Sequence, residues 1–233
     1  MQSSTVQSAR SQSAVNSFLM SVYNWMSVGL LLTAGVAWYV ANSQTMLQLI
    51  FGNRMVFFGL IIAELGLVVA ISAGIQRMKA GTATLLFMLY SALNGATLAS
   101  IFIVYTKSSI FSTFIVCAAM FATCSVYGMV TKKDLTGVGN FMFMGLIGII
   151  IATVVNFFLK SSGMAMIISY VGVVVFVGLT AYDTQKIKAM ALAQPGDLDS
   201  GTLRKGAILG ALTLYLDFIN LFLMLLRIMG DRE

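Results

Sequence analysis

The chain has 233 residues, of which 59% are hydrophobic and only 9% are charged, with a mean hydropathy of +0.93 and a net charge of +6. Soluble domains carry about 25% charged residues, so this composition excludes an ordinary soluble protein and predicts an integral membrane protein. The positive charge does not indicate a nucleic-acid partner, because the basic residues stand at the ends of apolar segments and not in a patch with aromatic residues.

The chain begins with a polar segment. Residues 1–18 are rich in Ser and Gln and contain one basic residue, Arg10. They lack the basic, apolar and small-residue pattern of a cleaved signal peptide. We therefore expect a short, poorly ordered cytoplasmic tail.

Seven segments that follow are long and apolar enough to cross a membrane, which takes about 20 residues. They are 19–41, 55–76, 82–105, 109–131, 138–160, 164–186 and 206–229. Backbone polar groups in lipid must be satisfied within each segment, so we expect an all-α membrane domain over 19–230. Its one long connection is the loop 187–205, with Pro195, Gly196, Asp197 and Asp199.

The basic residues predict how the spans are oriented, because they are enriched on the cytoplasmic side. With the N-terminus inside, that side carries nine basic residues: Arg10, Arg77, Lys79, Lys132, Lys133, Lys186, Lys188, Arg204 and Lys205. The other side carries five: Arg54, Lys107, Lys160, Arg227 and Arg232. We therefore expect the N-terminus and the loop 187–205 inside and the C-terminus outside.

The second span carries an acidic residue, Glu64, near its middle. Acidic residues inside the membrane commonly mark ion paths, and two interpretations stay open. Glu64 is either a further acidic group on an ion pathway or a structural residue hydrogen-bonded to Ser, Thr or Asn of a neighbouring helix. Arg77, near the cytoplasmic end of this span, either clamps a carboxylate at its level or is an ordinary basic residue of that side.

Polar residues of the third and fourth spans favour packing over chemistry. Asn94 and Thr97 accompany small residues at four-residue spacing, which is typical of helix contacts. Cys117 and Cys124 lie about 10 Å apart along one helix face, too far for a disulfide.

The chain has no histidine, no HExxH and no GxGD-type motif. We therefore expect neither an enzymatic activity nor a resident cofactor.

The sixth span ends unusually, because its apolar run 175–181 meets Asp183 before it meets Lys186 and Lys188. The two lysines can extend to the interface, whereas the aspartate side chain is too short to do so. Asp183 is therefore either a helix-end carboxylate paired locally with these lysines or a group that faces a neighbouring helix.

The seventh span carries Asp217 about 16 Å from its start, close to mid-membrane. A charged group at this depth costs several kcal/mol, so it usually faces protein and finds a partner. Small and polar residues recur on its face at spacings of three and four: Gly206, Gly210, Thr213, Asp217, Asn220, Met224 and Arg227. This stripe predicts a helix enclosed by protein, and it makes Thr213 and Asn220 candidates for lining an ion pathway.

A contact between Asp183 and Asp217 would have chemical consequences. Two like charges in a low dielectric cannot both ionise easily, so the pair would share a proton, titrate as a unit and sense pH. Two carboxylates also suit Ca²⁺, which prefers oxygen ligands, as a weak transit site. Because Asp183 is the shallower residue, the contact requires the seventh span to be shifted, tilted or begun deeper.

Two C-terminal motifs, GLTAYDTQKIK at 178–188 and LGALTLYLDFINLFLMLLRIMG at 209–230, resemble those of the Bax inhibitor family, the transmembrane BAX inhibitor motif proteins. The resemblance covers nearly the whole chain, including VYNWMSVGLLLTAGVAW at 22–38 and LLFMLYSALNGATLASIFIVY at 85–105. It is strongest to proteobacterial inner-membrane members. It implies a seven-helix fold with the last helix central in the bundle, in the bacterial inner membrane.

The resemblance also implies a function. Family members have been linked to Ca²⁺ leak, with an aspartate pair between helices six and seven as a pH-responsive latch that an arginine of helix two can bridge. Asp183 and Asp217 match that pair by motif, and Arg77 is the candidate for the bridge. We therefore expect a pH-sensitive cation leak gated by the pair, with Ca²⁺ as the permeant ion. The longer loop 187–205 separates the two aspartates farther in sequence than in the small calcium-leak members.

A second function comes from another class. Some bacterial relatives are thought to modulate membrane proteolysis, and the chain would then be a regulator that binds a membrane protease or another membrane protein without transporting ions. The N-terminal tail or the loop 187–205 would form the binding surface. In both cases the lipid bilayer is the surrounding partner.

Overall fold

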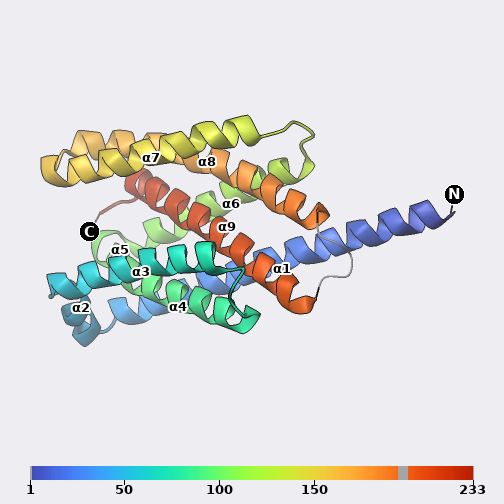
Figure 1. Cartoon of the computed structure of the whole chain (residues 1–233). Helices are drawn as coiled ribbons and strands as arrows, with labels where there is room; N and C mark the ends of the chain where they lie inside the picture. The colour runs from blue at the N-terminus through green and yellow to red at the C-terminus, as the bar shows by residue number, and fades with distance from the viewer. Residues whose placement is uncertain (1, 194–198, 233) are drawn as a thin grey trace. The chain divides into compact units, whose positions relative to one another are not determined.

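The computed structural model describes residues 2–193 and 199–232, with side chains from Ser13 onward. The described residues are helical in nine segments, drawn in Figure 1. These are α1 (Gln2–Ala41), α2 (Gln44–Phe51), α3 (Arg54–Gly74), α4 (Ala80–Leu98), α5 (Ile101–Val104), α6 (Lys107–Val130), α7 (Thr136–Leu159), α8 (Ser162–Leu192) and α9 (Ser200–Met229).

Seven helical segments in the described part of the chain are long and apolar enough to cross a membrane, as predicted. They are Ser13–Ala41, Arg54–Gly74, Ala80–Val104, Lys107–Val130, Thr136–Leu159, Ser162–Leu192 and Ser200–Met229. Polar caps explain several of their starts. The Asn53 side chain accepts a hydrogen bond of 2.9 Å from the Met55 N–H before α3, and Thr106 caps α6 in the same way.

The helices extend beyond the apolar runs at three places. In the expected tail, 1–18, the backbone is helical from Gln2 onward, and residues 2–18 contain no Gly or Pro to interrupt a helix. The poor order of this tail stays a prediction. The expected loop 187–205 is too long, because α8 continues to Leu192 and α9 begins at Ser200. Of the loop residues singled out above, Pro195, Gly196 and Asp197 lie outside the described residues, as does the Arg10 side chain.

The chain divides into two compact units. Unit 1 comprises Met1–Val104 and Ala189–Tyr215, and unit 2 comprises Tyr105–Lys188 and Leu216–Glu233. The boundary therefore falls inside α9, which contributes residues to both units. In α9, 67% of the most apolar window is buried, compared with 44% in α8 and 28% or less in the other spans. The expectation that the last helix is enclosed by protein is confirmed.

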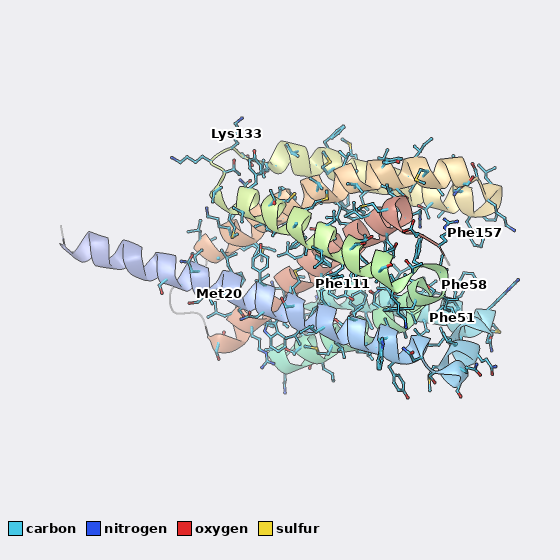
Figure 2. The ribbon with its side chains drawn as sticks, turned by 180° about the vertical axis from the view of Figure 1, so that it is seen from behind. Met20, Phe51, Phe58, Phe111, Lys133 and Phe157 are labelled. Carbon is cyan, nitrogen blue, oxygen red and sulfur yellow. The ribbon has the colours of Figure 1, made fainter. Side chains whose placement is uncertain are left out.

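In unit 1, α4 packs against α1 and α3, and the short helix α2 packs against α1 and α3. Gly95 of α4 lies against the backbone of Thr33, where a larger side chain would collide. An apolar cluster around Val40, Ile50 and Ala99 holds α2 in place. Figure 2 labels Phe51 and Phe58 at this end of the unit.

In unit 2, α8 packs closely against α6 and α7, and α7 and α8 run side by side in Figure 1. Gly128 of α6 lies against the backbone of Ala181, and Gly139 of α7 lies against the Tyr182 ring. Glycines allow such close approach of helices. After α9, Asp231 accepts a 3.2 Å hydrogen bond from the Ser109 hydroxyl at the start of α6.

Candidate functional site

The two intramembrane aspartates of unit 2 are in contact. The side chains of Asp183 on α8 and Asp217 on α9 are hydrogen-bonded to each other. Carboxylates are only acceptors, so a hydrogen bond between two carboxyl groups requires a proton on the pair. The contact between the two aspartates, which the sequence left as a condition, is therefore present.

Asp217 is the more deeply buried member, with 5% of its surface exposed. Its second oxygen, Oδ2, has no hydrogen-bond partner within the part of the chain that is described. Such a group is uncommon in folded proteins, because a buried polar atom without a partner costs about 1–3 kcal/mol. The contact with Asp183 is thus the interaction that the described residues offer this carboxyl group.

Both helices that carry the aspartates extend into the segment 187–205, which was predicted to be a loop. Asp183 does not stand at the helix end, because α8 continues for nine residues beyond it to Leu192. The α9 helix begins at Ser200, six residues before the apolar run suggested. Both aspartates thus lie inside long helices, and the pair forms within the helical part of unit 2.

The surroundings of Asp183 are small or hydroxylic residues that bring helices close. Thr184 donates a hydrogen bond of 3.4 Å to Ser125 of α6, and Thr180 donates one of 2.7 Å to the Phe176 carbonyl of its own helix. Both threonines are fully buried. Together with the close approach of α6 at Gly128, these contacts hold the α8 segment that carries Asp183 against α6.

The lysines after Asp183 have separate positions. Lys186 is exposed, its Nζ lies 5.8 Å from the centre of the Tyr182 ring, and its charge acts on Asp183. Lys188 instead donates a 2.6 Å hydrogen bond to the Met129 carbonyl near the end of α6. The structure therefore agrees with the second interpretation of Asp183, a group that faces a neighbouring helix, and the Lys186 charge lies one turn away.

The turn between α6 and α7 is held by a side chain of α8. The Gln185 amide accepts a hydrogen bond of 2.8 Å from the Leu135 N–H and donates one of 2.8 Å to the Lys133 carbonyl. Figure 2 shows Lys133 projecting outward at this turn. Next to it, the N–H and hydroxyl of Thr136 bond the Asp134 carboxylate, which holds the pKa of Asp134 below its usual range.

The other predicted site residues do not join the pair. Arg77 is exposed in the turn after α3 and belongs to unit 1, so its role as a latch stays a prediction. Thr213 and Asn220 each donate to a carbonyl four residues earlier in α9, at 3.1 and 2.8 Å. Such bonds within a helix are common for polar residues in apolar surroundings.

Glu64 lies in unit 1, where two side chains of α4 bind it. The Asn94 amide donates to Glu64 Oε2 at 3.1 Å, and the Thr97 hydroxyl donates to Glu64 Oε1 at 2.9 Å. This is the second arrangement that the sequence allowed, a carboxylate hydrogen-bonded to Asn and Thr of a neighbouring helix. Asn94 and Thr97, which the spacing assigned to packing, are therefore also ligands of a carboxylate.

Tyr215 is a buried polar residue that the sequence did not single out. Its hydroxyl donates a 3.0 Å hydrogen bond to Asn94 Oδ1 and lies 2.5 Å from the Thr33 hydroxyl. A tyrosine among leucines two residues before Asp217 was the available indication, since a buried tyrosine hydroxyl usually finds a partner.

The described residues contain no group of three or more His, Cys, Asp or Glu side chains able to hold a metal ion together. The Asp183–Asp217 pair supplies two carboxylates, which is fewer oxygen ligands than a tight Ca²⁺ site uses. Cys117 is buried and donates a weak 3.7 Å hydrogen bond to the Phe218 carbonyl, which agrees with packing.

Comparison with known proteins extends these observations. A family model described as the inhibitor of apoptosis-promoting Bax1 matches residues 15–233. The inner membrane protein YbhL of Escherichia coli K12 is 60% identical over 222 residues, which cover 95% of this chain and 94% of YbhL. A protein of Borreliella burgdorferi is 48% identical over 94% of this chain and 93% of its own length. A membrane protein of Streptococcus pyogenes is 36% identical over 96% of both chains.

Proposed function

The chain belongs to the Bax inhibitor family of membrane proteins, and from this premise we propose that it is a pH-sensitive Ca²⁺ leak pathway gated by Asp183 and Asp217. The observation that supports the proposal is the hydrogen bond between these two carboxyl groups inside unit 2. Loss of the shared proton would leave two like charges in a low-dielectric setting, where they repel each other. The proton therefore holds α8 and α9 together at this point.

The same two groups account for the choice of cation. When the pair loses its proton, it presents up to four carboxylate oxygens, which a hard cation such as Ca²⁺ prefers. Because two carboxylates bind weakly, the ion can also leave, which a conduction pathway requires. Ca²⁺ is cargo in this proposal, and the protein needs neither a resident cofactor nor an enzymatic reaction.

The proposed location is the bacterial inner membrane, which is where the name of YbhL places that protein. The proposed orientation has the N-terminus in the cytoplasm and the C-terminus in the periplasm, from the excess of basic residues on one side. A reporter enzyme that is active only in the periplasm, fused after Arg232, tests it. Activity of this fusion and inactivity of one at the N-terminus are expected, and the reverse result would refute the orientation.

Reconstitution in liposomes tests the leak directly. Ca²⁺ influx into vesicles that contain the purified chain should exceed influx into empty vesicles and should change with pH across neutrality. Asp183→Asn and Asp217→Asn should each flatten this pH response, because the pair then has only one titratable carboxyl. Asp134→Asn, which removes an exposed carboxylate between α6 and α7, is the matched control and should keep the pH response.

Absence of flux from folded protein would contradict the leak and favour the regulatory function. One observation is relevant to that alternative: the α1 helix begins at Gln2, before the apolar run predicted at 19–41. A helix that extends beyond this apolar run offers a surface to a membrane protease or another membrane protein. Removing residues 2–12 should leave Ca²⁺ flux intact if the leak is the function.

A further inference from the structure

A chain of hydrogen bonds runs through four helices of unit 1, away from the aspartate pair. It begins at Glu64 on α3 and passes through Asn94 on α4 and Tyr215 on α9 to Thr33 on α1. The donor–acceptor distances are 3.1, 3.0 and 2.5 Å in that order. Thr33 then reaches two backbone carbonyls, those of Ser91 at 2.8 Å and Gly29 at 2.9 Å.

The members of this hydrogen-bond chain differ in how deeply they are buried. Asn94, Tyr215 and Thr33 are buried, whereas Glu64 is half-buried. Glu64 is therefore the least buried member of the hydrogen-bond chain, and it is also its only carboxyl group. Among the interior members, only the Tyr215 phenol is ionisable. These members can therefore respond to a change in the charge of Glu64 only by exchanging donor and acceptor roles in their hydrogen bonds.

Few charged or titratable groups surround Glu64. The phenols of Tyr90 on α4 and Tyr215 on α9 lie close enough to feel its charge. The α2 helix, which packs on α3, contains no titratable residue. Within α3 the charged residue Arg54 lies ten residues away, about 15 Å along the helix. The charge on Glu64 is thus balanced mainly by the hydrogen bonds that Asn94 and Thr97 donate.

The hydroxyl protons are too few to satisfy all contacts at once. Thr33 has one hydroxyl proton and three acceptors in reach: the Tyr215 oxygen and two carbonyls. Tyr215 has one proton and two acceptors, Asn94 Oδ1 and the Thr33 oxygen. Each hydroxyl can donate to only one of these acceptors at a time, so the hydrogen bonds of the chain can run in either direction.

The state of Glu64 decides the direction. When Glu64 is ionised, it accepts from the Asn94 amide, which in turn accepts from Tyr215 through Oδ1. Tyr215 then accepts from Thr33. When Glu64 carries a proton, its O–H is a donor and needs an acceptor, which the Asn94 amide provides after a half turn that brings Oδ1 toward Glu64.

The remaining steps follow from the half turn of Asn94. Its NH₂ group then faces the Tyr215 oxygen and donates to it, so Tyr215 donates to Thr33 and Thr33 donates to the Ser91 or Gly29 carbonyl. Thr97 keeps its hydrogen bond to Glu64 Oε1, because the oxygen without the proton is still an acceptor. Glu64 gains one proton from solvent, and every other group keeps its own proton and only rotates.

We propose that Glu64 is a second proton-binding site of this protein and that its protonation reverses the hydrogen-bond chain through Asn94, Tyr215 and Thr33. The site is separate from Asp183 and Asp217 and does not depend on the leak proposed above. As a consequence, protonation of Glu64 changes hydrogen bonds on α3, α4, α9 and α1 together. Because α9 carries Tyr215 as well as Asp217, the same helix has a member in each proton-binding site.

Infrared difference spectroscopy of the full-length protein in lipid nanodiscs, between neutral and acidic pH, tests the proposal. Acidification should produce a protonated-carboxyl C=O band that Glu64→Gln removes. The same band should persist in the Asp183→Asn/Asp217→Asn double variant, which separates this site from the aspartate pair. An acid difference spectrum that Glu64→Gln leaves unchanged would overturn the second proton-binding site.

The reversal of the chain has its own measurement. With ring-labelled tyrosine, the acid-induced shift of the tyrosine C–O band should disappear in Tyr215→Phe. It should persist in Tyr90→Phe, the matched control, because the Tyr90 ring touches the Tyr215 ring at 5.5 Å between centres but Tyr90 is not a member of the chain. Thermal melting shows that each variant is folded. A carboxyl band without a Tyr215 response would refute the reversal.

Discussion

Asp183 and Asp217 hold each other by a hydrogen bond between two carboxyl groups, one from the sixth membrane helix and one from the seventh. Asp217 is buried and Asp183 is partly buried, and a carboxyl group inside a membrane helix usually pairs with another polar group. The contact needs a proton, and the proton makes the contact reversible. A carboxyl pair of this kind makes the packing of α8 against α9 depend on the pH.

The first prediction separates the hydrogen bond from the charge. In Asp217→Asn, the amide can still donate to the Asp183 carboxylate without a titratable proton. In Asp217→Ala, the Asp183 carboxyl loses its partner, which should lower the free energy of unfolding by about 1–3 kcal/mol. Thermal unfolding in detergent should therefore rank the wild type close to Asp217→Asn and well above Asp217→Ala. Equal stability of the Asn and Ala variants would contradict the pairing.

The second prediction concerns the close approach of α6 and α8. A methyl group added at Gly128 would collide with the backbone of Ala181, which cannot move independently. Gly128→Ala should therefore destabilise the protein by about 1–3 kcal/mol. Gly148→Ala is the control, because nothing lies within 4 Å of the added carbon, and alanine stabilises a helix by about 0.5–1 kcal/mol relative to glycine. Melting temperatures that move the same way in both variants would be inconsistent with this packing.

The third prediction concerns the turn that Gln185 holds. Gln185→Ala removes the hydrogen bonds to the Leu135 N–H and the Lys133 carbonyl. Trypsin should then cleave after Lys132 or Lys133 faster than in the wild type, because the turn opens more often. Gln185→Glu keeps the acceptor but loses the donor, so its cleavage rate should lie between the two. Unchanged cleavage in Gln185→Ala would mean that the turn is held by other contacts.

The fourth prediction concerns pH at the start of α9. The hydroxyl and N–H of Thr202 bond the Asp199 carboxylate at 2.5 and 3.1 Å, which holds the pKa of Asp199 below its usual value of 3.8. A lowered pKa in the folded state stabilises the helix start above about pH 3.8, and this contribution is lost as the pH falls through the folded pKa.

Amide hydrogen exchange of the first turn of α9 measures this effect. After correction for the intrinsic dependence of exchange on pH, protection of the Thr202 amide should decrease on acidification in the wild type. In Asp199→Asn the side chain can still cap the helix but cannot titrate, so protection should stay constant. A wild-type profile as flat as that of Asp199→Asn would refute the lowered pKa.

The seven spans could be predicted because lipid imposes a simple rule on the sequence. A membrane helix needs a long apolar run, and such runs stand out in a chain with 9% charged residues. The helix α2 was not predicted, because eight residues are too short for that rule, whereas α5 falls inside the predicted span 82–105. The ends of α1, α8 and α9 were misplaced because a helix can continue past its apolar run through polar residues, as it does at 187–192 and 200–205.

The candidate site divides in the same way. By itself the sequence determined which groups need partners, because Glu64, Asp183 and Asp217 interrupt apolar runs where an unpaired charge is costly. Only the tertiary structure decided the partners: Asp183 meets Asp217, whereas Glu64 meets Asn94 and Thr97 and, through Asn94, Tyr215. The physical reason is that hydropathy depends on one residue and its immediate neighbours, whereas a hydrogen bond between helices depends on their register and rotation. Those two quantities are settled by packing between helices at positions such as Gly95 and Gly128, which meet residues distant in the sequence.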